Sequence, residues 1–109
     1  MSYRATTLLL TMSLSTVAQA QLVGAERETF SEGAFKTCFQ KLERDTPARP
    51  AVTRGYFCFC YVNDLADHVS PNEFQAMAEL LTAGKVEATQ AKMAPFTRAG
   101  NLKCAAILR

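Results

Sequence analysis

Four cysteines constrain the fold of this chain more than any other feature. Cys58 and Cys60 are one residue apart, whereas Cys38 and Cys104 lie far from them on either side. A ring that joined Cys58 to Cys60 would be very small and strained, so two disulfide frameworks remain possible. These are Cys38–Cys58 with Cys60–Cys104, and Cys38–Cys60 with Cys58–Cys104. In both, the segment around Cys58 is tied to an earlier segment and to the C-terminal one.

The first 20 residues are typical of a secretory signal peptide. Arg4 carries the one positive charge, residues 5–17 are apolar or hydroxylic, and Ala18-Gln19-Ala20 fits the small-x-small cleavage rule. The apolar stretch is shorter than the ~20 residues that span a bilayer. We therefore expect cleavage before Gln21, a periplasmic or secreted product, and no stable membrane insertion afterwards. Such oxidising compartments favour disulfides.

Residues 21–109 suffice for one domain. A domain of this size buries only about two-thirds of its unfolded surface, so disulfides would add stability that burial alone supplies poorly. The chain has 12 Lys and Arg, of which Arg4 lies in the first 20 residues, against 10 Asp and Glu. This near balance excludes a strongly basic nucleic-acid-binding surface. The one arginine cluster is expected to be ordinary solvated surface; it comprises Arg44, Arg49 and Arg54.

The first predicted helix covers residues 30–45. Its apolar side chains recur at i, i+3, i+4 and i+7, the spacing of one helix face, at Phe35, Cys38, Phe39 and Leu42. Thr29 and Glu32 form a T-x-x-E capping box, with Ser31 as a rival cap. The two prolines of the segment 46–50 then end the helix.

The second predicted helix covers residues 54–68, with Thr53 as its cap. One face is apolar and includes the first cysteine of the close pair; it comprises Cys58, Val62, Leu65 and Val69. The polar face, which we expect to be solvated, comprises Asn63, Asp64 and Asp67. A strand is the alternative for residues 56–62, which are mostly aromatic, β-branched or cysteine. Helix is favoured because the apolar spacing continues beyond this stretch.

Two further helices are predicted. Ser70-Pro71-Asn72-Glu73 combines an N-cap serine, a proline at the first helical position and a glutamate that closes a capping box. The helix that follows has apolar residues at Phe74, Met77, Ala78 and Leu81. Gly84 ends it. A fourth helix covers residues 85–98, where Pro95 should kink or end it. Gly100-Asn101 is expected to turn the chain into a short apolar tail that carries Cys104.

These patterns predict an all-α fold, a small bundle of about four helices tied by two disulfides. Few residues suggest a catalytic or metal-binding site. Cys58, Cys60 and His68 could serve as soft metal ligands, but residues two apart on a helix point about 200° apart. A thiol-redox role would want C-x-x-C, and no G-x-S-x-G or convergent acid pair supports hydrolysis. We therefore expect no enzyme activity, no catalytic or metal-binding residues and no cofactor. His68 should be partly exposed near a helix end.

Several segments together resemble one family. They are Phe30-x-x-Gly33 followed by Cys38; Cys58-x-x-Tyr61-Val62 followed by Leu65-Ala66-Asp67; the helix from Ser70 to Leu81; and the late Cys104. Spread over most of residues 21–109, they resemble the small periplasmic immunity proteins that protect bacteria against type VI secretion amidase effectors. The chain differs at Cys60, where that family would be expected to have a small residue, usually glycine.

The resemblance implies a disulfide-linked helical protein, often a dimer, that inhibits a cell-wall amidase sterically by placing a loop or helix end in its groove. The expected partner is thus another protein of the cell envelope. Candidate contact surfaces are the linker 46–54 and the polar face of the second helix. Two alternatives remain: a periplasmic stress or assembly chaperone that exposes apolar surface in acid, and a metal-binding module for copper or zinc.

Overall fold

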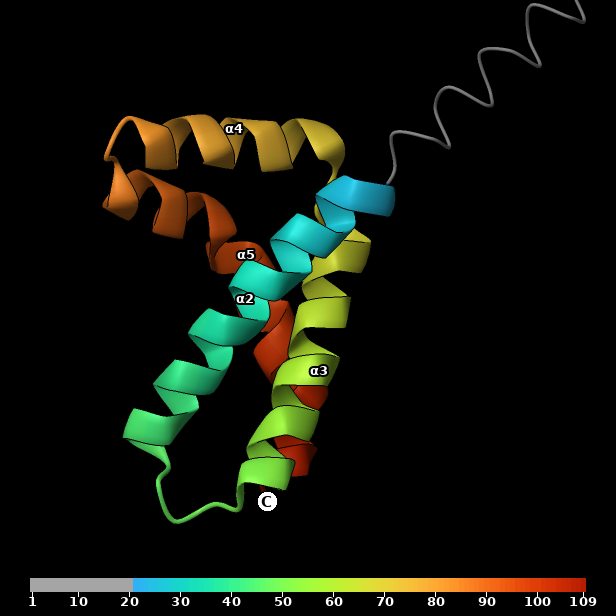
Figure 1. Ribbon diagram of the computed structural model, residues 1–109, viewed down its shortest axis with the longest axis vertical. Coiled ribbons are helices and arrows are strands. Elements are labelled where there is room, and N and C mark those ends of the chain that lie inside the picture. Colours follow the sequence, from blue (N-terminus) through green and yellow to red (C-terminus); the bar gives the residue numbers. More distant parts are fainter. Residues whose placement is uncertain (1–20) are drawn as a thin grey trace, which may run out of the picture.

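The computed structural model describes residues 21–109, so the predicted signal peptide lies outside the described residues. The described chain is all-α, as the apolar spacing predicted, and contains no strand between residues 21 and 109. The stretch 56–62, for which a strand was the alternative, is helical. Figure 1 shows the elements, which are α2 (Gly24–Asp45), α3 (Ala51–His68), α4 (Pro71–Thr82), α5 (Val86–Cys104) and the 3₁₀ turn η1 (Ala105–Leu108).

Helix α3 lies at the centre of the arrangement. Helix α2 packs along one side of it, and the C-terminal part of α5 with η1 packs along another (Figure 1). The Cys38–Cys58 disulfide joins α2 to α3, and the Cys60–Cys104 disulfide joins α3 to the end of α5. This decides between the two possible frameworks. Because residues two apart on a helix point about 200° apart, Cys58 and Cys60 face different neighbours.

The buried apolar side chains form two clusters at opposite ends of α3. One surrounds the disulfides and contains Cys38, Phe57, Cys58 and Cys104, with Phe39, Leu42, Cys60, Tyr61 and Leu108 packed against it. The other contains Leu22, Val69 and Met77, with Phe30, Phe74, Met93 and Phe96 packed against it. The predicted inner face of α3 is confirmed, since Cys58, Val62, Leu65 and Val69 are all buried.

The helix starts predicted for α2 and α3 were wrong. Helix α2 begins at Gly24 rather than near Phe30, and among the described residues no side chain caps it. The Thr29–Glu32 pair therefore lies inside a helix rather than at its end. Helix α3 begins at Ala51, directly after Pro50, instead of at Arg54. A proline just before a helix costs no hydrogen bond, because the first helical amides have no intrahelical acceptor anyway.

Both ends of α4 follow the sequence signals. The Ser70 hydroxyl accepts a hydrogen bond from the Glu73 amide at 3.2 Å, and the Glu73 carboxylate accepts one from the Ser70 amide at 2.9 Å. At the other end Gly84 adopts φ of +75°, which glycine tolerates without steric cost. Its amide bonds the Leu81 carbonyl and the Lys85 amide bonds that of Leu80, which is the Schellman pattern.

Helix α5 runs further than predicted. Pro95 lies inside it and does not end it, but Figure 1 shows α5 changing direction between its first part, beside α4, and its last part, behind α3. We attribute the bend to this proline, since a proline ring displaces the preceding helical turn. Gly100-Asn101 is not a turn, because both residues are helical. Gly100 is buried instead, with the ring of Tyr61 against it.

Candidate binding surfaces

The four predicted site cysteines are all joined in the two disulfides, and none is free. A metal site built on Cys58, Cys60 and His68 would need free thiolates, which this arrangement does not offer. Between residues 21 and 109, no group of three His, Cys, Asp or Glu side chains converges to hold a metal ion. His68 is largely exposed at the end of α3, as expected, and its Nδ1 lies 2.7 Å from the Asp64 carbonyl oxygen.

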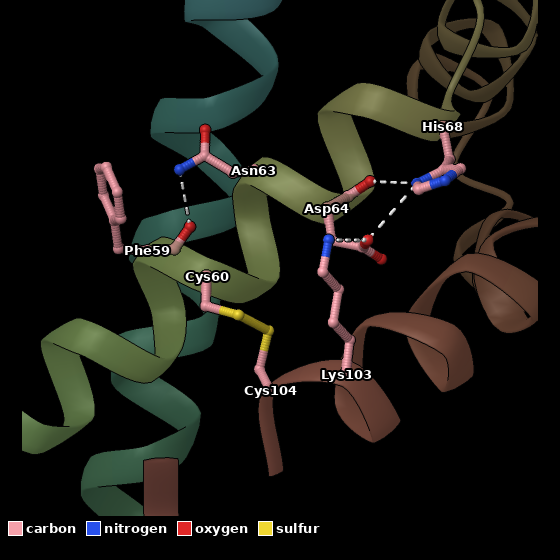
Figure 2. Close-up of a disulfide and its surroundings, with 7 residues drawn as sticks. All are labelled: Phe59, Cys60, Asn63, Asp64, His68, Lys103 and Cys104. Carbon is pink, nitrogen blue, oxygen red and sulfur yellow. Dashed lines mark hydrogen bonds and ion pairs between the residues drawn. A yellow bond between two sulfur atoms is a disulfide. The ribbon is translucent and has the colours of Figure 1, made fainter. Parts of the chain in front are cut away.

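Asp64 corrects the prediction of a solvated polar face on α3. Its side chain is buried, with the residue only 5% exposed, between α3 and the C-terminal part of α5. Lys103 Nζ lies 3.3 Å from Asp64 Oδ1, and His68 Nδ1 lies 3.5 Å from the same oxygen (Figure 2). Asp67, by contrast, is exposed and bonds Arg27 of α2 at 2.8 Å. Helical spacing alone does not reveal the burial of Asp64, because it depends on where α5 crosses.

The linker proposed as a contact surface is shorter than predicted. Only residues 46–50 connect the helices, because residues 51–54 already belong to α3. Arg54 is held by the protein itself: its guanidinium lies 5.4 Å from the ring centre of Phe39 and bonds the Arg49 carbonyl. A side chain fixed in this way is less available to a partner than free surface would be.

An apolar face runs along α3 on the side away from the Cys60–Cys104 disulfide. Val52, Tyr56 and Phe59 recur at i, i+4 and i+7, so they share one face of the helix. Tyr56 is 64% exposed and Phe59 67% exposed. Figure 2 shows the Phe59 ring on the opposite side of α3 from Cys104. We call these three residues the aromatic face. All three side chains are open to solvent, and they lie outside the inner face that the apolar spacing predicted for this helix.

A shallow apolar groove continues from the aromatic face toward α2. Its volume is about 370 Å³, and its lining consists of Ser31, Glu32, Phe35, Lys36, Phe59, Val62 and Asn63. Phe35, predicted as a core residue, stacks on Phe39 with ring centres 6.1 Å apart and remains partly exposed. The groove is open and mostly apolar, a surface suited to shape contacts rather than to chemistry on a small substrate.

The turn between α4 and α5 forms a second apolar projection. Figure 1 shows α4 and the first part of α5 extending together away from α2 and α3, with the turn at their far end. Leu81 and Val86 flank this turn and are 55% and 53% exposed. Leu81 was predicted to be a core residue of its helix. We call residues 81–86 the hairpin tip. The two Schellman hydrogen bonds fix its backbone, so it is held in one shape.

Tyr61 is a titratable residue whose pKa is changed by the fold. Its phenol is partly buried between α3 and α5, and this burial raises the pKa above the ordinary value near 10, since a charged phenolate would lose its hydration there. The phenol therefore stays neutral across the physiological range. It contributes packing area rather than a catalytic base.

The fold and surfaces define a class, that of small all-α proteins with two disulfides and exposed apolar surfaces. No helix of residues 21–109 has the length and apolarity to cross a membrane. The two disulfides fit a protein of an oxidising compartment. No family model matches the chain, and no curated protein or solved structure is similar enough to it to count as a match.

Proposed function

We propose that this chain is a non-enzymatic binding protein of the periplasm that inhibits a cell-envelope effector enzyme, in the manner of an immunity protein. The observation that carries the proposal is the hairpin tip, an exposed apolar turn held rigid by its own backbone hydrogen bonds. A preformed element loses little conformational entropy when it binds, so its apolar area contributes to affinity more fully. A convex tip fits a concave partner, such as the substrate groove of an enzyme.

The disulfides support the same proposal. They fix α2 and the end of α5 to α3, so that the bent α5 leads from a covalently linked region directly to the hairpin tip. The weak resemblance to amidase immunity proteins agrees with this arrangement of a rigid body and a projecting element. A homodimer belongs to the same proposal, and sedimentation velocity on the mature chain tests it.

The test uses purified periplasmic peptidoglycan amidases, beginning with any that is encoded beside the gene for this chain, with dye-labelled peptidoglycan as substrate. The mature chain is expected to lower dye release in proportion to its concentration. L81D and V86D should each weaken inhibition roughly tenfold or more, because a charge in an apolar contact must be desolvated without a partner. L102D is the matched control, since Leu102 is 82% exposed and lies outside the tip.

The outcomes separate clearly. Inhibition by the wild type that L81D and V86D lose and L102D keeps would support the proposal. Undiminished amidase activity with the wild type in molar excess would contradict it. If all three variants still inhibit the amidase, the proposed inhibition would be supported, but the hairpin tip would not be the surface that contacts the enzyme.

A chaperone of the periplasm is the second candidate, and the aromatic face favours it. Exposed aromatic side chains in a row can bind apolar segments of unfolded proteins. The test is suppression of light scattering by a denatured client protein at neutral and at acid pH. Y56S/F59S should abolish suppression by a chaperone but leave amidase inhibition through the hairpin tip intact.

A further inference from the structure

The aromatic face and the apolar groove form one continuous surface along α2 and α3. Phe59 belongs to both, since it lies on the aromatic face of α3 and lines the groove, whose opposite wall is formed by α2 with Phe35. Helices α2 and α3 lie side by side with opposite directions, so the surface extends over two neighbouring helices (Figure 1). An exposed apolar surface of this extent on a small protein indicates a contact site.

The wall of the groove that α2 forms carries one acidic and one basic side chain. These are Glu32 and Lys36, which lie one helical turn apart. Both residues are exposed, and neither forms an ion pair with another residue of the described range 21–109. Opposite charges beside an apolar patch are complementary to an inverted copy of the same surface.

We propose that the groove and the aromatic face bind a second copy of this chain, in an antiparallel arrangement in which Glu32 of each copy pairs with Lys36 of the other. The two-fold axis lies in the interface and crosses α2 midway between these two residues. The rotation reverses α2, so each glutamate comes opposite a lysine, and both pairs form at once. The grooves of the two copies then face each other, and the rings of Phe35 and Phe59 are enclosed between them.

The area of the surface agrees with a second copy. Phe35, Tyr56 and Phe59 are 36%, 64% and 67% exposed, so together they present roughly 300 Å² of side-chain surface, given about 200 Å² for a whole aromatic side chain. Two copies bury about twice that area, and a polar rim contributes a similar amount in interfaces of this kind. The total approaches the ~1,200 Å² at which specific, stable interfaces begin.

This inference specifies the contact surface of the homodimer that the proposed function includes, but it does not rest on amidase inhibition. The hairpin tip and the aromatic face are different surfaces, so a monomeric chain could still inhibit, and a dimer could form without inhibiting any enzyme. The chaperone candidate requires the aromatic face to be open, whereas the dimer covers it. Dimerisation therefore also argues against the chaperone.

Sedimentation velocity of the purified, oxidised chain at low ionic strength tests the proposal. At roughly 100 µM, a concentration chosen for an interface near the lower size limit, the wild type should sediment with the mass of two copies. F59D should sediment as one copy, because each interface would then bury two unpaired charges. L102D is the matched control, since Leu102 is exposed on α5, outside the proposed surface, and this variant should remain a dimer.

Exchange of the two charges tests the antiparallel arrangement itself. E32K and K36E should each weaken association roughly tenfold, because either change replaces two attractive contacts by two repulsive ones. The double variant E32K/K36E restores opposite charges at both contacts and should recover the wild-type dimer. An equimolar mixture of E32K and K36E should likewise form a mixed dimer, since one copy then carries two lysines and the other two glutamates.

A wild type that sediments as one copy at this concentration would overturn the proposal and would assign the exposed surface to a different partner. Dimerisation of F59D with wild-type affinity would place the interface elsewhere and would also overturn it. Wild-type association of E32K and K36E, or failure of their mixture to associate, would contradict the antiparallel pairing. Circular dichroism of each variant, expected to match the wild type, separates lost association from lost folding.

Discussion

The two buried clusters show two ways to hold a small helical core together. The disulfide-linked region surrounds Cys38, Phe57, Cys58 and Cys104, and two covalent bonds cross it. The packed region joins the start of α2, the end of α3, α4 and the first part of α5 through Leu22, Val69 and Met77, without any disulfide. The hairpin tip belongs to the packed region. The part that projects is thus held by apolar packing and backbone hydrogen bonds, whereas the Cys60–Cys104 disulfide holds only the far end of α5.

Removal of the disulfides should have the largest effect and should weaken the disulfide-linked region first. The C60S/C104S pair opens a loop of 44 residues and the C38S/C58S pair one of 20. Chain entropy then predicts losses in the free energy of unfolding of about 4 and about 3 kcal/mol, as upper values. Urea denaturation of the two double variants measures both. Equal stability of C60S/C104S and the wild type would contradict the structural role of the second disulfide.

Met77→Ala should have the next largest effect and should act on the packed region. Met77 is buried between α4 and the facing helices, and a truncation there leaves a cavity worth about 3 kcal/mol. Hydrogen exchange should show α4 and the hairpin tip loosened while residues around Cys58 stay protected. Met77→Leu, which preserves volume, is the control and should cost less than about 1.5 kcal/mol. Uniform loosening of both regions would show that they unfold as one unit.

Gly100→Ala tests the close approach of α5 to α3. A Cβ atom there would lie 3.0 Å from Tyr61 Cδ1, so the ring or the helix must move. We expect a loss of about 1–2 kcal/mol in the free energy of unfolding, although alanine favours helix more than glycine does. In a Tyr61→Leu background the same substitution should cost less, which a double-mutant cycle by urea denaturation measures. Stabilisation by Gly100→Ala alone would contradict the predicted clash.

Ser70→Ala removes the capping box of α4 and should cost about 1 kcal/mol. The effect should be local, with faster amide exchange in the first turn of α4 and an unchanged disulfide-linked region. Ser70→Asp keeps an oxygen acceptor at the cap and should retain most of the stability. Equal losses for alanine and aspartate would indicate that the cap hydrogen bond is not the cause.

The smallest expected effect is an alkaline one. Because the folded state raises the pKa of Tyr61, its stabilising contribution is complete below the unfolded value near 10 and is lost as the pH rises through the folded one. The free energy of unfolding should therefore fall slightly between pH 9 and about pH 11 in the wild type. Tyr61→Phe, measured by urea denaturation at both pH values, should fall less. An identical fall in the two proteins would assign the effect to other groups.

Local signals in the sequence predicted the local structure well. The capping box of Ser70 and Glu73 and the C-terminal glycine at Gly84 set both ends of α4. These residues provide hydrogen bonds for the backbone N–H and C=O groups at the helix ends, and they do so independently of the surrounding structure. The inner face of α3 also followed its apolar spacing. The start of α2 did not, since no side chain caps it and the buried Leu22 just before it anchors the chain instead.

The candidate surfaces could not be predicted in the same way. Leu81 has the spacing of a core residue, yet it is exposed, because no other helix of the described chain covers it. Asp64 has the spacing of a solvated residue, yet α5 covers it. Burial of a side chain depends on which elements cross in space, and the bend of α5 after Pro95 determines that crossing here.

The sequence by itself determined the helical class, the location of each helix to within several residues, and the need for Cys58 and Cys60 to pair with distant cysteines. Those features rest on local backbone chemistry and on ring strain, which involve near neighbours only. Tertiary structure alone decided which cysteine pairs with which, which apolar side chains remain exposed, and why one aspartate is buried. Each of these depends on how α2 and α5 approach α3, and that geometry arises only when the whole chain has packed.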